Sequence, residues 1–204
     1  CGRIILVYCG GIELDDKREA ILAACRHLLE ESGTVTIDKV AAMAGVAKGT
    51  VYLYFENKQE LVLQTFLAII GEITEIIDEA SRSAGGTSQQ RLAAMVEAHY
   101  TAVRGKMKIL YNLFREETEF SRRPIQGHAF QLVQSLKQLK YRYVTILHEG
   151  ITQGEFRPHR VEIAAAAILA MIHNLSTTDI FWPMENQEQV VPELLQLILQ
   201  GIIK

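Results

Sequence analysis

The chain has 204 residues, of which 49% are hydrophobic and 22% charged, and its formal net charge is −3. This length allows one large domain or two small ones, with a core that needs no disulfide or structural metal. The near-average composition excludes a disordered chain, and the slight acidic excess excludes a generally basic nucleic-acid coat. Any surface that binds nucleic acid must therefore be local.

The three cysteines, Cys1, Cys9 and Cys25, all lie near the start of the sequence. An odd number at one end cannot staple the remaining fold, so we expect a reducing, cytoplasmic compartment and no metal site. No apolar run approaches the roughly 18 residues of a membrane span, and the apolar segment 4–9 lacks the cleavage site of a signal peptide. Since the chain begins with Cys1 rather than Met, we interpret residues 1–13 as an N-terminal extension or a tag remnant.

Beyond Leu14 the apolar residues follow a helical pattern almost throughout, which predicts an all-α fold. Asp16 with Glu19 has the spacing of a capping box, and Gly33 stands where the first helix would end. Cys25 lies on the apolar stripe of this helix and is expected in the core. The loop 84–90 and the prolines separate further predicted helices at 37–44, 48–54, 58–83, 89–104, 106–119, 126–153, 160–181 and 187–203.

Short helices around a tight turn in segment 36–61 are typical of a helix-turn-helix. Thr36 is a good N-cap for the first of them, and Gly45 interrupts the pattern after about two turns. In such a motif the second helix enters the major groove of DNA, with apolar residues facing inward and polar or aromatic residues facing outward. Val51 and Phe55 fit the inward positions.

The outward positions of this second helix offer a positive charge, hydroxyl groups and one residue without a side chain: Lys48, Gly49, Thr50, Tyr52 and Tyr54. Gly49 permits close approach of the backbone to DNA, and the hydroxyls can donate to phosphates or base edges. Lys58 adds a cation where the next helix begins, beside backbone amides that favour a phosphate. The alternative is an ordinary helical hairpin with exposed tyrosines.

The segment resembles the DNA-binding domain of the TetR family of transcriptional regulators over about residues 16–66. The shared features are the cap Thr36, the Ala-Gly-Val turn at 44–46, the recognition-helix pattern at 49–55 and the helix start at 58–61. The resemblance implies phosphate contacts from Thr36, Lys48, Tyr54 and Lys58, and groove contacts from Lys48, Gly49, Thr50 and Tyr52. One departure is Ala47, which stands where the family often has a Ser or Thr cap worth about 1 kcal/mol.

Charge argues for binding as a dimer. Residues 15–62 contain six basic and eight acidic side chains, so this part of the chain carries a net charge of −2. Nonspecific affinity for DNA should therefore be modest. Specific binding would require a dimer that places two recognition helices in successive major grooves, roughly 34–36 Å apart, on a pseudo-palindromic operator.

The expected organisation is a DNA-binding domain at 14–62 followed by an effector-binding and dimerisation domain at 63–204. The last two predicted helices are rich in small and aliphatic residues, and one chain has too few partners to cover both. In the TetR family the corresponding pair forms a four-helix bundle between two subunits, which implies a homodimer here. The alternative is burial of both helices within one chain.

The C-terminal domain also carries aromatic and polar residues at helical spacing, which we predict to line a pocket for a small, lipophilic effector. The candidates are His99, Tyr100, Met107, Tyr111, Phe114, Arg115, Phe130, Tyr143, His173, Asn174 and Trp182. Arg115 could hold one carboxylate of such an effector. Each residue alone could also be ordinary core.

Catalysis is not predicted. His148 and Glu149 begin a metalloprotease-like string, but Thr152 stands where the second histidine belongs, and no phosphate loop or nucleophile elbow occurs. No cofactor is expected. The sequence predicts a ligand-responsive regulator, most simply a repressor, in which the effector tilts the helix beginning at Lys58. The alternatives are an activator with the same DNA contacts, or a helical small-molecule-binding protein or enzyme with a vestigial helix-turn-helix.

Overall fold

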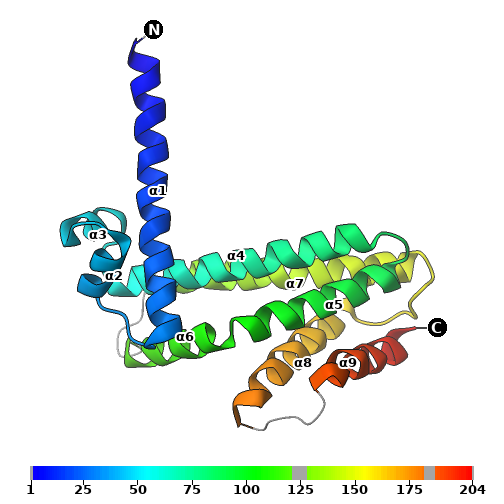
Figure 1. The fold of residues 1–204 in the computed structure, drawn as a ribbon. Coiled ribbons are helices and arrows are strands. Elements are labelled where there is room, and N and C mark those ends of the chain that lie inside the picture. The colour runs from blue at the N-terminus through cyan, green and yellow to red at the C-terminus, as the bar shows by residue number, and fades with distance from the viewer. Residues whose placement is uncertain (1, 121–127, 182–186, 204) are drawn as a thin grey trace. The chain divides into compact units, whose positions relative to one another are not determined.

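The structure is a computed structural model that describes residues 2–120, 128–181 and 187–203, and these residues form an all-α fold, as predicted (Figure 1). Within these ranges the β contacts amount to one isolated antiparallel bridge between Phe156 and Ile203. None of the described helices combines the length and the apolar content that a bilayer crossing requires. The helices are α1 Gly2–Glu31, α2 Ile37–Ala44, α3 Lys48–Tyr54, α4 Lys58–Ala84, α5 Ser88–Gly105, α6 Met107–Phe120, α7 His128–Thr152, α8 Val161–Phe181 and α9 Gln187–Ile202.

Local capping explains where α2 begins and ends. The hydroxyl oxygen of Thr36 accepts a hydrogen bond from the amide of Lys39 at 3.3 Å, which satisfies one of the unpaired amides of the first turn. Gly45 ends the helix in the left-handed conformation, with φ at 67°, which glycine adopts without steric cost. Both residues therefore have the capping roles that the sequence predicts.

The start of α1 differs from the prediction. The capping-box interpretation of Asp16 is wrong, because α1 begins at Gly2 and Asp16 lies inside the helix. Residues 2–15 contain no proline that would end a helix upstream of Asp16. The C-terminal end of α1 agrees with the prediction, since Gly33 follows it with φ at 66°.

The described residues pack into two compact units. The first comprises residues 1–68 and 108–129, and the second comprises residues 69–107 and 130–204. In the first unit Ile21, Cys25 and Leu29 of α1 are fully buried, and the amide of Asn112 donates to the carbonyl oxygen of Leu29 at 2.7 Å. Cys25 is therefore the core residue that its position on the stripe predicts.

The core of the second unit is built from the second half of α4 together with α5, α7, α8 and α9. Its fully or almost fully buried side chains include Leu92, Tyr143, Leu147, Ile172 and Leu194. The α4 helix runs from the first unit into the second without a break. A domain boundary directly after residue 62 stays a prediction.

Candidate nucleic-acid interface and effector region

The short helix α3 has one buried and one exposed face. Val51 and Phe55 are 0% and 1% exposed, so they take the inward positions that the sequence predicts. Lys48, Gly49 and Tyr52 are exposed, and Tyr52 keeps 48% of its surface accessible. A polar and aromatic face of this kind, held by an apolar anchor, is suited to reading a DNA groove.

Gly49 is not required by the packing or the backbone of the free protein. A methyl group on its Cα would meet no heavy atom within 4 Å, and its φ lies outside the left-handed region. Alanine is the better helix former at such a position. Packing within the protein therefore does not account for the glycine, and the close approach of DNA to this residue stays a prediction.

Lys48 is held by an ion pair that the sequence pattern did not predict. Its ammonium lies 2.8 Å from one carboxylate oxygen of Asp38 in α2 and donates to the other at 3.0 Å. The hydrogen bond to Asp38 raises the pKa of Lys48 above its ordinary value, so the ammonium stays charged. Because both side chains are largely exposed, a DNA phosphate could replace the carboxylate at little cost.

The predicted phosphate-binding residues occupy three different local settings. Thr36 uses its hydroxyl oxygen for the cap, which leaves the hydroxyl proton able to bond to a phosphate. Tyr54 is half-buried, with its ring centroid 6.5 Å from that of Phe55. Lys58 is the first residue of α4 and is also half-buried.

The start of α4 already uses part of its anion-binding capacity. The side chain of Asn57 accepts from the amide of Glu60 at 2.9 Å, and the carboxylate of Glu60 accepts from the amide of Glu56 at 2.6 Å. These two bonds occupy amides that could otherwise face a phosphate. A phosphate contact here would depend mainly on the charge of Lys58.

Sequence reasoning overlooked Leu53. This side chain is 83% exposed on α3, between Tyr52 and Tyr54. The signal was available, because a residue two positions from both Val51 and Phe55 must lie on the opposite face of a helix. An exposed apolar side chain there is suited to contact the methyl group of a thymine.

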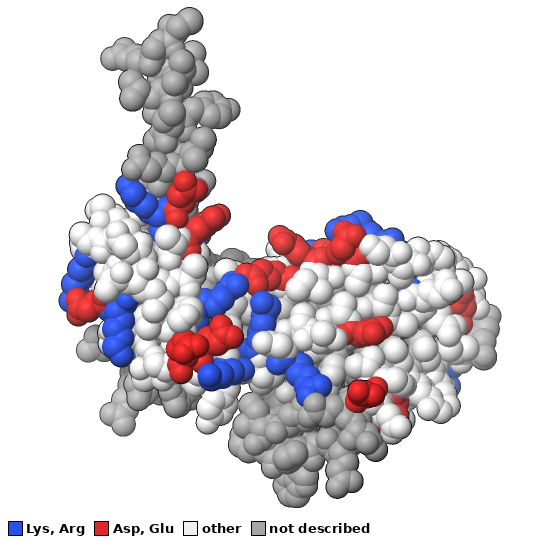
Figure 2. All heavy atoms as spheres, viewed as in Figure 1, with Lys and Arg blue, Asp and Glu red and all other residues white. Residues whose placement is uncertain are grey.

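Basic and acidic side chains alternate on the visible face of the described residues (Figure 2). This arrangement agrees with the small net charge of segment 15–62. Long-range attraction to DNA is therefore weak, and affinity must come from specific local contacts.

Among the predicted effector residues, the structure brings His99, Tyr143 and His173 together between α5, α7 and α8. The hydroxyl of Tyr143 lies 2.9 Å from Nδ1 of His99, and the ring of His173 stands edge-on to that of His99 at 5.5 Å. Burial, followed by the charge of His173, lowers the pKa of His99 to about 3, so its imidazole is neutral. Its buried Nε2 has no hydrogen-bond partner among the described residues.

The remaining effector candidates are more dispersed. Tyr100 is buried and Met107 half-buried, whereas Asn174 is exposed. Phe130 is 67% exposed, and Tyr111, which is 46% exposed, belongs to the first unit. The side chains of Phe114 and Arg115, and the whole of Trp182, lie outside the described residues. The proposed pocket role of these residues stays a prediction.

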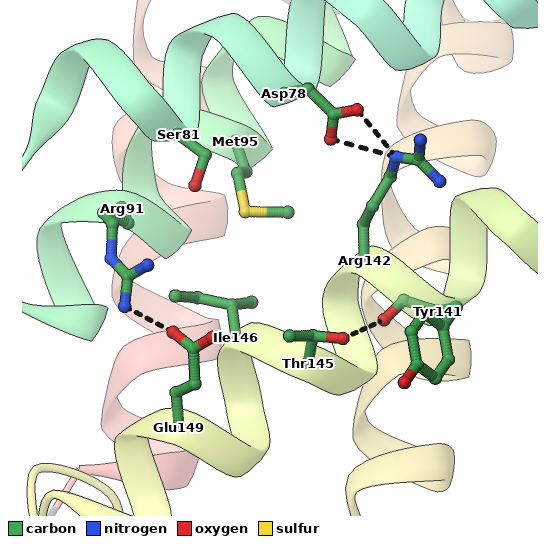
Figure 3. A pocket seen from close by; sticks show the side chains of 9 residues that line it. All are labelled: Asp78, Ser81, Arg91, Met95, Tyr141, Arg142, Thr145, Ile146 and Glu149. Atoms are coloured by element: carbon green, nitrogen blue, oxygen red, sulfur yellow. Dashed lines mark hydrogen bonds and ion pairs between the residues drawn. The ribbon is translucent and has the colours of Figure 1, made fainter.

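A pocket of about 350 Å³ lies elsewhere in the second unit, between α4, α5 and α7 (Figure 3). None of the predicted effector residues lines it. Met95 stands at its centre, between an ion pair of Arg142 with Asp78 and an ion pair of Arg91 with Glu149. Within the described part of the chain no group of three or more His, Cys, Asp or Glu side chains could hold a metal ion.

Comparison with protein families agrees with both parts of the chain. The model for bacterial regulatory proteins of the tetR family matches residues 21–65, and a model for a tetracyclin repressor-like C-terminal domain matches residues 85–177. Together they cover more than half of the sequence. The fold and the exposed face of α3 thus define a helix-turn-helix regulator of transcription. The chain belongs to the tetR family of bacterial regulatory proteins.

Several similar proteins are known over nearly the full length. The fatty acid metabolism regulator protein of Bacillus subtilis is 27% identical over 193 residues, which covers 89% of this chain and 93% of the relative. The repressor KstR2 of Mycolicibacterium smegmatis is 24% identical and covers 91% and 90% of the two chains. The crystal structure of the Bacillus subtilis regulator FadR in complex with stearoyl-CoA aligns with a TM-score of 0.72 at 25% identity, over 90% of this chain and 98% of that one. These relatives are regulators of transcription rather than enzymes.

Proposed function

We propose that the protein is a homodimeric repressor that binds a pseudo-palindromic operator and leaves it when a small, lipophilic effector binds. The observation that carries this proposal is the exposed face of α3, where Gly49 and Tyr52 lie opposite the buried Val51 and Phe55. The family and the names of the relatives support the remaining parts. We place its action in the cytoplasm, where operator DNA is accessible.

In this account, contacts to the base edges in the groove and contacts to the phosphates are made by different residues. Lys48, Gly49, Thr50 and Tyr52 read the groove, while Thr36, Tyr54 and Lys58 hold phosphates. When Lys48 reaches the DNA, its ammonium leaves Asp38 and binds a phosphate or a base edge. The carboxylate of Asp38 is then unpaired and would repel any phosphate that lay near it. Binding therefore depends on where Lys48 and Asp38 lie relative to the phosphates, and not only on the net charge of the domain.

The dimer would form through α8 and α9. On α8 the residues Ala165 and Ile168 are buried within the chain, whereas Ile163 is 56% exposed on the outside. On α9 Leu194 is buried, and Leu197 is 67% exposed. A second copy that covers these faces would bury apolar surface, and the small residues of α8 would allow close approach of the helices.

The effector would bind in the second unit. The names of similar proteins refer to fatty acid metabolism and to stearoyl-CoA, which supports a long acyl chain as the lipophilic part. His99 and Tyr143 would supply polar contacts, since the buried Nε2 of His99 has a bond to gain from a ligand.

Coupling between the two sites would run through α4, which is continuous from Lys58 in the first unit to Ala84 in the second. A tilt of this helix would change the spacing of the two recognition helices. The effector can shift the equilibrium only as far as it binds the DNA-incompetent state more tightly.

Selection of genomic DNA fragments by the purified chain tests the regulator, with Tyr52→Ala as the control variant. We expect a discrete palindrome that the variant does not recover, next to genes whose products indicate the effector. Recovery of no specific fragment at low salt would contradict the proposal. It would favour a helical ligand-binding protein whose helix-turn-helix is vestigial.

A further inference from the structure

The pocket between α4, α5 and α7 combines an apolar interior with charged walls (Figure 3). Met95 from α5 and Ile146 from α7 lie between the two ion pairs. A volume of about 350 Å³ is at the lower end of the range of small-molecule sites. The pocket can therefore hold part of an effector rather than a large ligand in full.

Both arginines in the pocket wall have hydrogen-bond donors to spare. Arg142 uses Nε for both carboxylate oxygens of Asp78, at 2.9 and 3.0 Å, and Nη1 for the carbonyl oxygen of Gln138 at 3.0 Å. Arg91 uses Nη2 for Glu149 at 2.5 Å and for Ser88 at 3.5 Å. Nη2 of Arg142, and Nε and Nη1 of Arg91, have no partner among the described residues.

The carboxylates in the wall are, by contrast, already paired with the two arginines. Both oxygens of Asp78 accept from Arg142, and one oxygen of Glu149 accepts from Arg91. Ser81 of α4 adds a hydroxyl that lies between Asp78 and Arg91 in Figure 3. Each of the three helices thus contributes a hydrogen-bond donor to one apolar pocket. The ligand group that matches such a set of donors is an oxyanion, which accepts hydrogen bonds and carries a negative charge.

We propose that this pocket binds the anionic end of the effector, with Arg91, Arg142 and Ser81 donating to its oxygens and the adjoining chain packed against Met95 and Ile146. This inference rests on the proposed lipophilic effector and adds the position and charge of its polar end. The anion is either the carboxylate of a fatty acid or a phosphate of an acyl-CoA, since a guanidinium binds both.

The existing ion pairs permit such binding. The side chains of Arg91 and Glu149 are 26% and 39% exposed, and those of Arg142 and Asp78 are 31% and 32% exposed. Because both pairs are only partly buried, water can solvate the carboxylate that an arginine releases when it binds a ligand. Glu149 then acts as a competitor of the ligand for Arg91.

This competition predicts opposite effects for the two members of one ion pair. Calorimetric titration of the full chain with oleate should show about tenfold weaker binding in Arg91→Gln, because a charge-assisted hydrogen bond is lost. Glu149→Gln should bind oleate severalfold more tightly, because Arg91 is released. A merely structural ion pair would give the same loss in both variants, since each breaks the same contact.

Two controls define the measurement. Arg82→Gln removes another exposed ion pair of α4, with Glu79 at 2.7 Å, which lies outside the pocket and should leave oleate binding unchanged. Methyl oleate, which has no charge, should bind wild type more weakly than oleate and should not respond to Arg91→Gln. Thermal unfolding of each variant checks that the fold is retained.

Oleoyl-CoA and free CoA distinguish the two sources of the anion. If Arg91→Gln weakens the binding of oleate, the bound anion is the carboxylate. If Arg91→Gln weakens the binding of oleoyl-CoA but not of oleate, the bound anion is a phosphate of CoA. Either result supports the inference. Unchanged affinity of Arg91→Gln for both oleate and oleoyl-CoA, or equal losses in Arg91→Gln and Glu149→Gln for the probe that responds, would overturn it while leaving the lipophilic effector intact. Failure of wild type to bind any of the acyl probes would overturn the effector proposal as well.

Discussion

Replacing Gly49 with alanine separates what DNA requires from what the protein requires. A methyl group at Gly49 meets no heavy atom within 4 Å, and the residue is the second of α3. Alanine is favoured over glycine in a helix by about 0.5–1 kcal/mol, with the lower value suited to a first turn. The free variant should therefore be about 0.5 kcal/mol more stable than wild type, which raises Tm by about 1–2 °C in a chain of this size.

Binding to the operator should change in the opposite direction. If the backbone of α3 lies against DNA at Gly49, the added methyl group holds the helix away from the groove and weakens its hydrogen bonds. We expect at least a tenfold loss of affinity, or about 1.4 kcal/mol. Fluorescence anisotropy of a labelled operator at fixed salt measures the affinity, and thermal unfolding measures the stability.

Gly71→Ala is the matched control. Gly71 is an exposed glycine in the interior of α4 with no heavy atom within 4 Å of the added methyl group, so a stabilisation of about 1 kcal/mol is expected without loss of DNA binding. Unchanged operator affinity in Gly49→Ala would refute a close approach of DNA at this residue. A loss of stability together with affinity would show instead that the glycine serves the fold.

Three further predictions concern the DNA contacts and the buried histidine. Tyr52→Ala should weaken operator binding and relax base preference, whereas Lys58→Ala should weaken all sequences alike and reduce the salt slope by about one unit; anisotropy at several salt concentrations checks this, and identical effects would contradict the assigned roles. If Leu53 contacts a thymine methyl group, replacing that operator thymine with deoxyuridine should weaken binding of wild type but not of Leu53→Ala. A wild type that binds equally well whichever operator thymine is replaced would refute a methyl contact. Because the folded pKa of His99, about 3, lies below its ordinary value, the unfolded chain binds more protons as pH falls through 6.5. Stability should then be about 2 kcal/mol lower at pH 5 than at pH 7, and urea unfolding should show that His99→Phe loses most of this difference.

Local signals made most of the fold predictable from sequence. Thr36 and Gly45 fix the ends of α2 because a hydroxyl cap and a left-handed glycine act within a few residues. The start of α1 was missed because the capping spacing of Asp16 and Glu19 also occurs inside a helix. A two-residue pattern does not distinguish a cap from a solvent-exposed turn.

The candidate sites were predictable to a smaller extent. The faces of α3 follow from helical spacing, so Val51, Phe55 and Tyr52 could be assigned, and Leu53 could have been. The ion pair of Lys48 with Asp38 depends on how α2 and α3 pack, and the pairing of Arg91 with Glu149 joins residues 58 positions apart. Such contacts are set by tertiary packing, which spacing along one helix does not encode.

The response of the operator complex to an acyl ligand tests the central claim most directly. The protein is bound to the operator recovered from genomic selection, and oleoyl-CoA is added while anisotropy reports the bound DNA. The account predicts release of the DNA over the concentration range in which oleoyl-CoA binds the free protein, because the effector binds the DNA-incompetent state more tightly. Operator affinity that stays constant while the ligand saturates the protein would contradict a ligand-responsive repressor.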